Sequence, residues 1–418
     1  MANITDSIDR HELSDTFAYK TLRKIGGRIR RGLMHLPPRL MAAGLPPSWV
    51  GYRWMAEEKV AAYFARHRRT LAPAESYETI HPRAVAANPL PLNVFDRETL
   101  PKERGWWGYS FYDVPERVSD ETFIATVADC RIYFAFDSRK QFYPCIVTKD
   151  DRALYLREIA FKPHHFPVVR EARQPIRIQQ ATWILERVYH NHSHWLTAHL
   201  PKLNLLKSRQ ALENVLLPPS LGGAMDASLR LLGLDPADFQ TFDPTRPIEV
   251  KELTVVGTDR FRPELLRPVR DTLAIAGTRP PERRIFISRA RSHGRQLVNE
   301  DEIWPILRNA GFERVFMEEL SFEEQVRLMG ETAVLLAPHG AGMTNMMFCP
   351  AGAQVVEIAD LGFPNPNFYA LASAMGHGYR IVPAQALGEV HPLHKDLAVN
   401  PSAVREAIGQ IEAAKAAE

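Results

Sequence analysis

The chain has 418 residues, of which 45% are hydrophobic and 24% charged, and its formal net charge is +3 at pH 7. These values are typical of a folded globular protein, and the length is sufficient for two domains. A charge so close to balance gives no indication of nucleic-acid binding, so no nucleic-acid partner is expected. The three cysteines, Cys130, Cys145 and Cys349, form no CxxC pair, which favours reduced thiols and a cytoplasmic location over a disulfide scaffold.

Residues 1–70 are predicted to form a basic N-terminal extension. No apolar run indicates a signal peptide or a transmembrane helix. Residues 16–56 contain eight Lys and Arg but no Asp or Glu, and apolar residues recur among them at roughly helical spacing. A basic amphipathic helix of this kind can lie on an anionic bilayer. We therefore expect residues 20–39 to contact the inner face of a membrane peripherally; the alternative is a basic helix packed on the protein itself.

Residues 71–278 are predicted to form an N-terminal domain. Short apolar stretches alternate there with turn residues, which favours strands at 122–127, 131–136, 145–148 and 253–256. The segment 279–282 combines paired prolines with charged residues, which indicates a linker. A second domain is therefore expected to begin near residue 279.

Residues 279–390 show a more regular rhythm. Strands are predicted at 284–287, 314–317, 333–337 and 354–358, with helices at 299–310 and 321–329 between them. Gly311 is a natural C-cap for the first helix, and Ser321 with Glu324 forms a capping-box pattern for the second. Alternating strands and helices predict a parallel sheet. Residues 391–418 are expected to form a C-terminal helical tail, and a cleft is expected between the two domains.

One loop in this second domain has the composition of a phosphate site. Gly340, Ala341 and Gly342 follow a predicted strand and precede a helix expected to start near Thr344. Glycines allow close approach of the backbone, and free N–H groups at a helix start favour a negative charge. Asn345 replaces the third glycine of a dinucleotide fingerprint, which argues against a nicotinamide-dependent oxidoreductase. The alternative is a tight turn without a ligand.

Polar residues also follow the neighbouring strands. Ser288 and Arg289 come directly after the strand 284–287, and Arg295 lies in the same loop. Guanidinium groups suit the oxygens of a diphosphate, although arginine is equally common as a solvated loop residue. Glu357, near the end of the last predicted strand, could bind a ribose hydroxyl or be a buried structural carboxylate. Ligands of parallel sheets bind at the carboxyl ends of strands, where these residues are expected.

Several short blocks between residues 180 and 380 follow one another in a specific order. They are Arg-Ile-Phe-Ile-Ser-Arg at 284–289, Asn-Glu-Asp-Glu at 299–302, Ser-Phe-Glu-Glu-Gln at 321–325 and His-Gly-Ala-Gly-Met-Thr-Asn at 339–345, followed by Phe348, Pro350, Gly352 and Glu357. An upstream block, Asn-His-Ser-His-Trp-Leu at 191–196, precedes Leu-Pro-Lys-Leu at 200–203. Together these blocks resemble the family-61 glycosyltransferases.

The resemblance implies an α/β fold of GT-B type, in which two Rossmann-like domains with parallel sheets face one another across a cleft. It also implies an inverting transfer from a nucleotide-sugar donor, often UDP-linked, to a glycan or lipid-linked glycan acceptor. The donor would bind to residues 279–390, at a site that includes His339. The acceptor would bind to residues 71–278. We expect a bacterial-type enzyme of capsular or envelope polysaccharide biosynthesis. Relatives often place an acidic residue where this chain has Thr197 and Ala198.

An inverting transfer needs a base for the acceptor hydroxyl and a positive group for the departing diphosphate. His194 is the predicted base; the alternative is a core histidine satisfied by hydrogen bonds. The chain has no Asp-x-Asp motif, so helix amides and arginines are expected to replace a metal, and no metal or other cofactor is predicted. A histidine cluster around residue 194 lacks accompanying Cys or carboxylate ligands. The alternative function is a non-catalytic glycan-binding or nucleotide-binding protein of the same fold.

Overall fold

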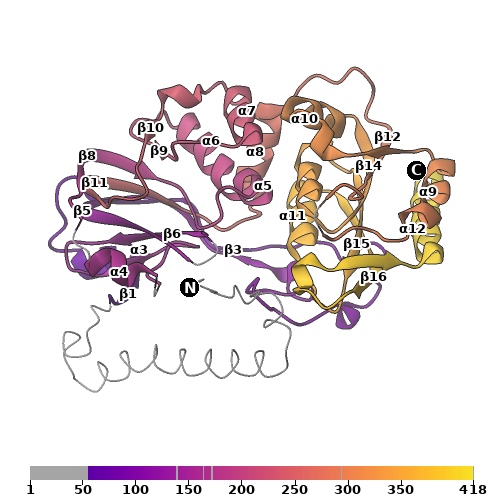
Figure 1. Ribbon diagram of the computed structural model, residues 1–418, viewed down its shortest axis with the longest axis horizontal. Coiled ribbons are helices and arrows are strands. Elements are labelled where there is room, and N and C mark those ends of the chain that lie inside the picture. The colour runs from indigo at the N-terminus through magenta and orange to yellow at the C-terminus, as the bar shows by residue number, and fades with distance from the viewer. Residues whose placement is uncertain (1–54, 138–139, 163, 171–172, 293, 418) are drawn as a thin grey trace, which may run out of the picture.

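The computed structural model describes residues 55–137, 140–162, 164–170, 173–292 and 294–417. These residues form two α/β halves that lie side by side, each built around one large β-sheet (Figure 1). The predicted membrane-contact segment, residues 20–39, lies outside the described residues. Within the described residues, no helix combines the length and hydropathy that a membrane crossing requires.

The N-terminal sheet has seven strands in the order β1-β7-β6-β5-β11-β8, with β2 paired to β5. Their bounds are β1 (Glu57–Lys59), β2 (Ser76–His81), β5 (Thr122–Phe136), β6 (Phe142–Val147), β7 (Ala153–Tyr155), β8 (Ile176–Trp183) and β11 (Ile248–Gly257). Only the β1–β7 and β8–β11 pairs are parallel. The other pairs are antiparallel, so the predicted parallel, Rossmann-like sheet is wrong for this half.

The connections between these strands explain the antiparallel pairing. Short turns join β5 to β6 and β6 to β7, and a short turn can only reverse the chain. The predicted strands at 122–127 and 131–136 are parts of the single strand β5, which contains Asp129 with a φ of 52°. The strand predicted at 253–256 is confirmed within β11. The strand β1 and the helix that follows it lie inside the segment expected to be an extension.

Helices of the N-terminal half gather on the side of its sheet that faces the other half (Figure 1). They are α5 (His192–His194), η4 (Trp195–His199, a π-helical turn), α6 (Leu200–Ser208), α7 (Gly223–Leu231) and α8 (Pro263–Leu273). Helices α3 (Val60–His67) and α4 (His165–Arg170) lie away from this group. The remaining short elements are β3 (Ala84–Val85), β4 (Val118–Ser119), β9 (Leu216–Leu217), β10 (Gln240–Thr241), η2 (Arg97–Thr99), η3 (Val114–Glu116) and η5 (Pro236–Asp238).

The C-terminal sheet has six strands in the order β13-β12-β14-β15-β16-β17. They are β12 (Arg283–Ile287), β13 (Phe312–Val315), β14 (Thr332–Pro338), β15 (Gln354–Asp360), β16 (Gly378–Leu387) and β17 (Asp396–Val399). All neighbours are parallel except β16 and β17, so the parallel sheet predicted for this half is confirmed. Both faces of its central strands are buried, as is typical of parallel sheets.

Helices cover both faces of this sheet. They are α9 (Glu300–Asn309), α10 (Phe322–Gly330), α11 (Asn367–Met375), α12 (Pro401–Ala417), η6 (Met317–Glu319), η7 (Ala341–Phe348) and η8 (Pro392–His394). The predicted capping box is confirmed, because the Glu324 backbone N–H donates to Ser321 Oγ at 3.2 Å and the Ser321 N–H donates to Glu324 Oε2 at 2.7 Å. The segment expected to be a helical tail also contributes β17 to the sheet.

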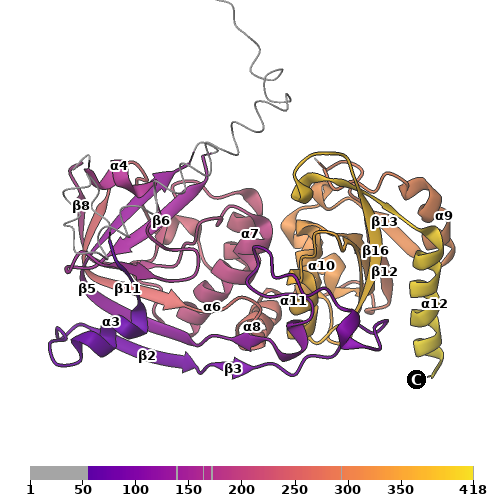
Figure 2. The same cartoon turned by 90° about the horizontal axis from the view of Figure 1, so that it is seen from below.

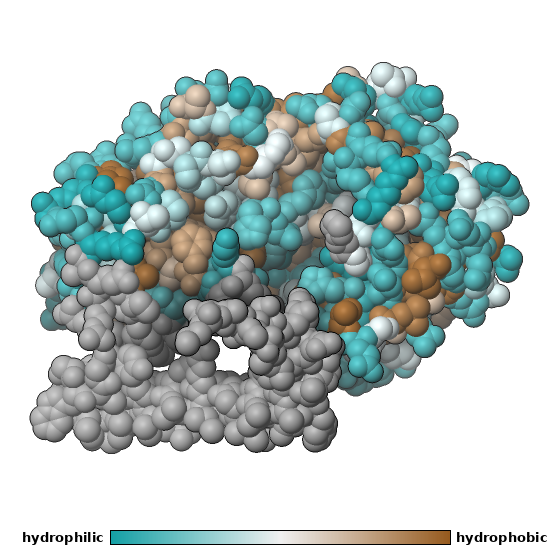
Figure 3. Space-filling view, viewed as in Figure 1, coloured by the Kyte–Doolittle hydropathy of each residue, from teal (hydrophilic) through white to brown (hydrophobic). Residues whose placement is uncertain are grey.

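The two halves share one hydrophobic core, which includes Leu253 on β11 and Leu335 on β14. A long segment between β3 and β4 crosses from the N-terminal half to the C-terminal half and returns (Figure 2). There the Leu92 N–H donates to the Tyr379 carbonyl at 2.7 Å, and Asn93 Nδ2 donates to the Ile381 carbonyl at 2.7 Å. The face seen in Figure 3 is mostly hydrophilic, with small separate hydrophobic groups. The shared core and the crossing segment hold the halves in fixed relation.

Candidate active site

The glycine loop between β14 and η7 is in close contact with Arg289. A Cβ carbon built on Gly340 would overlap Nη1 of Arg289 and lie 2.9 Å from its Cζ. The φ of Gly340 is 177°, an extended conformation that any residue can adopt. The close approach of the guanidinium, and not the backbone angle, therefore favours glycine at this position. The structure brings together the two loops that the sequence predicted to meet.

Arg289 and Arg295 form a pair of half-buried cations at this loop. Arg289 Nε donates to the Arg295 carbonyl at 3.1 Å, and its Nη2 donates to the Gly294 carbonyl at 3.0 Å. Among the described residues neither guanidinium has a carboxylate within ion-pair distance. Burial lowers the pKa of both groups, to about 10 for Arg295, where the charge of Arg289 adds to the effect. Both stay charged at pH 7, so the pair is suited to an anion.

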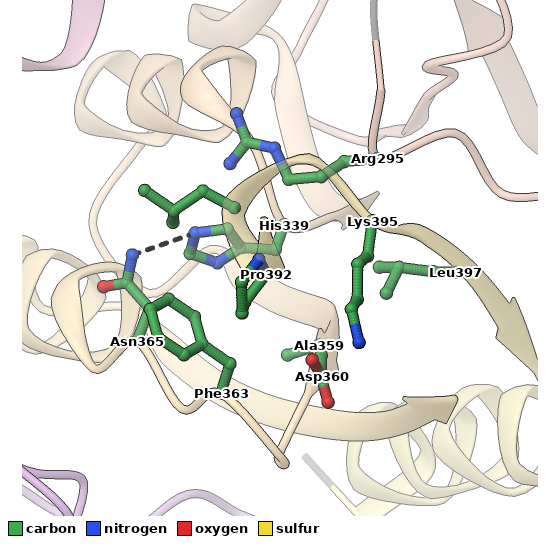
Figure 4. Close-up of a pocket in the computed structure, with 10 residues that line it drawn as sticks. Arg295, His339, Ala359, Asp360, Phe363, Asn365, Pro392, Lys395 and Leu397 are labelled. Carbon is green, nitrogen blue, oxygen red and sulfur yellow. Dashed lines mark hydrogen bonds between the residues drawn. The ribbon is translucent and has the colours of Figure 1, made fainter. Parts of the chain in front are cut away.

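Arg295 and His339 line one pocket at the carboxyl edge of the C-terminal sheet (Figure 4). Its walls come from the loops after β12, β14 and β15 and from the segment before β17. Asp360, Asn365 and Lys395 are its other polar members. The carboxyl ends of neighbouring parallel strands therefore meet at one site, as expected for a ligand pocket of such a sheet.

His339 is held by two side chains in a defined tautomer. Its Nδ1 contacts the buried carboxylate of Glu357, whose other oxygen accepts from Tyr379 OH at 2.6 Å. Its Nε2 lies 3.0 Å from Asn365 Nδ2, and Asn365 Oδ1 accepts from the Asn367 N–H at 3.1 Å, which fixes the amide orientation. Nε2 therefore accepts a hydrogen bond, and the neutral imidazole carries its proton on Nδ1. Glu357 positions His339 and is fully buried, outside the residues that line the pocket.

The other predicted donor residues have different surroundings. Ser288 Oγ is fully buried and contacts both carboxylate oxygens of Glu300 at 2.8 Å, so it supports the start of α9 and does not face the pocket. Ala341 and Gly342 belong to η7, which begins three residues earlier than predicted. Thr344 is fully buried, and its Oγ1 has no hydrogen-bond partner among the described residues.

Asn345 connects the two halves of the molecule. Its Nδ2 donates to Gln325 Oε1 on α10 at 2.8 Å, so its Oδ1 faces His192 Nε2 of the N-terminal half at 2.9 Å. His192 Nε2 must then carry a proton. The asparagine at the third glycine position of the loop thus has a bridging role between α5 and α10.

His194, the predicted base, lies on α5 in the N-terminal half and outside the pocket of His339. Its Nδ1 is buried without a hydrogen-bond partner among the described residues. Burial lowers its pKa to about 2, and the positive charges of Arg260 and Arg157 contribute. The imidazole is therefore neutral, as a base must be before it accepts a proton, but its protonated form is disfavoured in the ligand-free protein.

The predicted histidine cluster is divided among separate structural roles. His199 Nδ1 contacts the His194 carbonyl at 3.0 Å, and its Nε2 accepts from the Glu186 N–H at 3.0 Å. His192 is engaged with Asn345, as described above. The described part of the chain holds no group of three or more His, Cys, Asp or Glu side chains arranged to bind a metal ion.

Sequence reasoning missed Asn365 and Arg260. Asn365 lies between β15 and α11, in a loop to which the carboxyl-edge rule applies as well as it does to the loops after β12 and β14. Arg260 follows the end of β11 and is 7% exposed. It donates to Thr197 Oγ1 at 2.7 Å and to Ser193 Oγ at 3.2 Å. Nothing in the sequence pattern indicates that this arginine would turn toward α5.

Comparison with known proteins supports a glycosyltransferase, with which the two-sheet α/β fold is consistent. Residues 192–356 match the family model described as Glycosyltransferase 61. The match begins on α5 and ends within β15, so it includes His194, Arg260, Arg289, Arg295 and the glycine loop. Glu357 lies one residue beyond it. The resemblance predicted from the sequence blocks is supported by this match.

Three relatives illustrate the range of activities among similar proteins. The chain is 36% identical over 109 residues to the EGF domain-specific O-linked N-acetylglucosamine transferase of Drosophila melanogaster. The aligned segment covers 24% of this chain and 20% of the relative. It is 33% identical over 130 residues to the β-1,2-xylosyltransferase XAX1 of Oryza sativa, 30% of this chain and 23% of the relative. It is 36% identical over 83 residues to protein O-linked-mannose β-1,4-N-acetylglucosaminyltransferase 2 of Xenopus laevis, 19% of this chain and 14% of the relative.

The matched part of the chain spans less than a quarter of the length of each of these relatives. The three relatives come from a fly, a plant and a frog. The expected bacterial-type, capsular assignment is therefore not supported by them, because none is a bacterial or capsular enzyme. The shared segment supports the reaction class without specifying sugar or acceptor.

Proposed function

We propose that this chain is a metal-independent, inverting glycosyltransferase that transfers a hexose or pentose from a nucleotide sugar to a glycan acceptor. One observation carries the proposal: two half-buried arginines without a carboxylate partner among the described residues meet the Gly340 loop at the carboxyl edge of a parallel sheet. The diphosphate of a UDP-linked donor has the charge and the forked oxygens that such a pair binds.

Positive charge at this position also serves the chemistry. When the bond from the sugar to the diphosphate breaks, negative charge develops on the departing diphosphate. The guanidinium of Arg289 is fixed by hydrogen bonds to the Arg295 and Gly294 carbonyls, so it can stabilise this charge without reorganisation. Arg295 adopts a φ of 54°, a left-handed conformation uncommon for a residue other than glycine, and uncommon backbone conformations often occur at functional sites.

The base in this proposal is His194, which accepts the proton of the acceptor hydroxyl as that oxygen attacks the anomeric carbon. Its location in the half opposite the donor pocket suits an acceptor that approaches from the face away from the diphosphate, as inversion requires. Its neutral state leaves a lone pair available. Burial, together with the charges of Arg260 and Arg157, lowers the pKa of His194, while Glu186 raises it, so a further negative charge from a substrate would stabilise the protonated form.

Release of UDP from a panel of UDP-linked sugars tests the proposal. Slow hydrolysis without an acceptor is expected for at least one hexose or pentose donor, in excess EDTA. Arg289→Met should release UDP more slowly than wild type. Arg291→Met, a substitution on the same loop, is the control and should release UDP at the wild-type rate. Absence of hydrolysis with every donor would contradict catalysis.

The second candidate function is a glycan-binding or nucleotide-binding protein that has lost transfer. It is favoured by Thr197 and Ala198 at the position where relatives often place an acidic residue, since Thr197 here accepts hydrogen bonds from Arg260. Such a protein would bind UDP but would not hydrolyse any nucleotide sugar. The same panel therefore separates the two functions.

Cellular location is a separate proposal. We propose a cytoplasmic enzyme in peripheral contact with anionic membrane through residues 20–39, where lipid-linked glycans would be accessible. The support is the charge of that segment alone. Co-sedimentation with anionic liposomes at low and high salt tests it, and equal pelleting of a variant that lacks residues 20–39 would refute it.

A further inference from the structure

A second group of buried and half-buried cations lies in the N-terminal half, beside the predicted base. Arg260 is 7% exposed, and its guanidinium donates to Ser193 and Thr197, which flank His194 in the chain. In the described part of the structure, no carboxylate lies within ion-pair distance of Arg260. Hydroxyl groups satisfy some of its N–H donors but leave its charge unbalanced.

Arg157 brings a second charge to the same place. Its Nη2 donates to Glu186 Oε2 at 2.9 Å, while the other oxygen of Glu186 accepts from Lys202 Nζ at 2.8 Å. One carboxylate is thus shared by two cations, and with Arg260 the group has an excess of positive charge. The Nε of Arg157 is buried and has no hydrogen-bond partner among the described residues.

His194 completes the group. Its Nδ1 is the second buried nitrogen there without a partner among the described residues, and the residue before it in the chain, Ser193, accepts a hydrogen bond from Arg260. Buried polar atoms are almost always hydrogen-bonded, so two such nitrogens beside an unbalanced guanidinium indicate that a ligand is needed to complete the group. The missing charge is negative, and the Nε of Arg157, which can only donate, lacks an acceptor.

We propose that Arg157, Arg260 and His194 form a second anion subsite, which takes one phosphate or carboxylate group of a substrate in the half opposite the donor pocket. The identity of that substrate rests on the proposed function. The prediction that the subsite binds an anion does not, because it follows from the cations and the unpaired nitrogens. The group is either the diphosphate of the donor, held between both halves, or an acid group of the acceptor, such as a uronate or a phosphate.

The subsite lies near the donor pocket across the boundary between the halves. Tyr109 donates its hydroxyl hydrogen to Asn367 Oδ1 at 2.8 Å. Burial raises the pKa of Tyr109 to about 12, although the nearby charges of Arg117 and Arg260 partly offset this rise. The Asn367 N–H in turn donates to Asn365, the residue that contacts His339 Nε2. An anion bound beside Arg260 would also balance the charge that His194 acquires when it accepts a proton.

Calorimetric titrations with UDP, glucuronic acid and inorganic phosphate test this subsite. Arg260→Met should weaken binding of at least one probe by roughly 10-fold to 100-fold, the loss expected for a charge-assisted hydrogen bond. The matched control is Arg117→Met, because Arg117 is also buried but donates to Asp259 at 2.7 Å. Weaker UDP binding in Arg260→Met identifies the donor diphosphate, whereas unchanged UDP binding with weaker glucuronic acid or phosphate binding identifies an acidic acceptor.

Equal binding of all three probes by wild type and Arg260→Met would overturn the subsite, and so would an equal loss in the Arg117→Met control. If Arg260→Met does not fold, the imidazole ¹⁵N shifts of His194, assigned with His194→Gln, replace it. A shift of these resonances on addition of a probe supports the subsite, and no shift with any probe overturns it. If wild type binds phosphate through Arg260 but does not bind UDP, the proposal of a UDP-linked donor is refuted. The proposal of an anion subsite is then still supported.

Discussion

Arg289 and Gly340, from two loops of the C-terminal sheet, are packed so closely that a Cβ carbon on Gly340 would overlap the guanidinium. Because the atoms in the way are the flexible end of Arg289, Gly340→Ala should displace the arginine and not unfold the loop. We expect UDP binding to weaken by about 1.5–3 kcal/mol, the value of a charged hydrogen bond, with a small change in Tm.

Gly342→Ala is the matched control, since a Cβ carbon there would lie 3.6 Å from its nearest neighbours, Ile287 and Met317. It should bind UDP like wild type. If both variants lose the same affinity, the loop itself and not the position of Arg289 determines binding.

Tyr379→Phe should destabilise the protein and disturb His339. The hydroxyl of Tyr379 donates to Glu357, whose carboxylate is fully buried and orients His339. An unsatisfied buried charge should lower the free energy of unfolding by about 1–3 kcal/mol, measured by urea denaturation. The exposed Tyr155 provides the control, because Tyr155→Phe should change stability little. Equal stability of both variants would show that Glu357 does not depend on Tyr379.

Lowering the pH should destabilise the protein at pH values that are still above those at which carboxylates titrate. Burial lowers the pKa to about 2 for His194, about 3 for His199 and about 4 for His165 and His377, from an ordinary value of 6.5. Below pH 6.5 the unfolded chain binds protons that the folded chain does not, so stability is full above pH 6.5 and falls as the pH decreases. Each histidine should contribute about 1.4 kcal/mol per pH unit.

Urea denaturation at pH 7, 6 and 5 measures this slope. His194→Gln should have a slope smaller by about 1.4 kcal/mol per unit below pH 6, because one titrating group has been removed. An identical slope in the variant would show that His194 is protonated in the folded protein near its ordinary pKa.

His194→Ala should reduce the transfer rate by roughly 10²–10⁴-fold, the range of one general base. His190→Ala is the control, because His190 is exposed four residues away. The KM for the donor should stay unchanged if His194 acts only on the acceptor. A rise in the donor KM would instead assign His194 to the diphosphate, and normal turnover would remove it from the reaction.

The C-terminal half was predictable because its strands are continuous apolar runs separated by helices with clear end signals, such as Ser321 with Glu324. The meeting of Arg289 with the glycine loop followed from the rule that ligands bind at the carboxyl ends of parallel strands. The antiparallel N-terminal sheet was not predicted, since its hairpins have no Asn-Gly or Asp-Gly turn signal and β5 continues through Asp129.

Contacts between residues far apart in the chain were beyond local patterns altogether. The Asn345 bridge to His192 joins residues 153 positions apart, and Arg260 reaches α5 across 67 positions. Sequence spacing specifies neighbours within a helix or a strand, whereas the first pair depends on how the two halves pack and the second on packing within the N-terminal half. The second anion subsite could therefore be found only in the structure.

The most direct measurement is a calorimetric titration of the wild-type protein with UDP in excess EDTA. Binding is expected to persist without divalent metal, because Arg289 and Arg295 supply the positive charge. Arg289→Met should lose about 1.5–3 kcal/mol of affinity, while Arg291→Met, on the same loop but exposed and paired with Glu319, should bind like wild type. Loss of UDP binding on addition of EDTA, or equal affinity of Arg289→Met and wild type, would contradict the account.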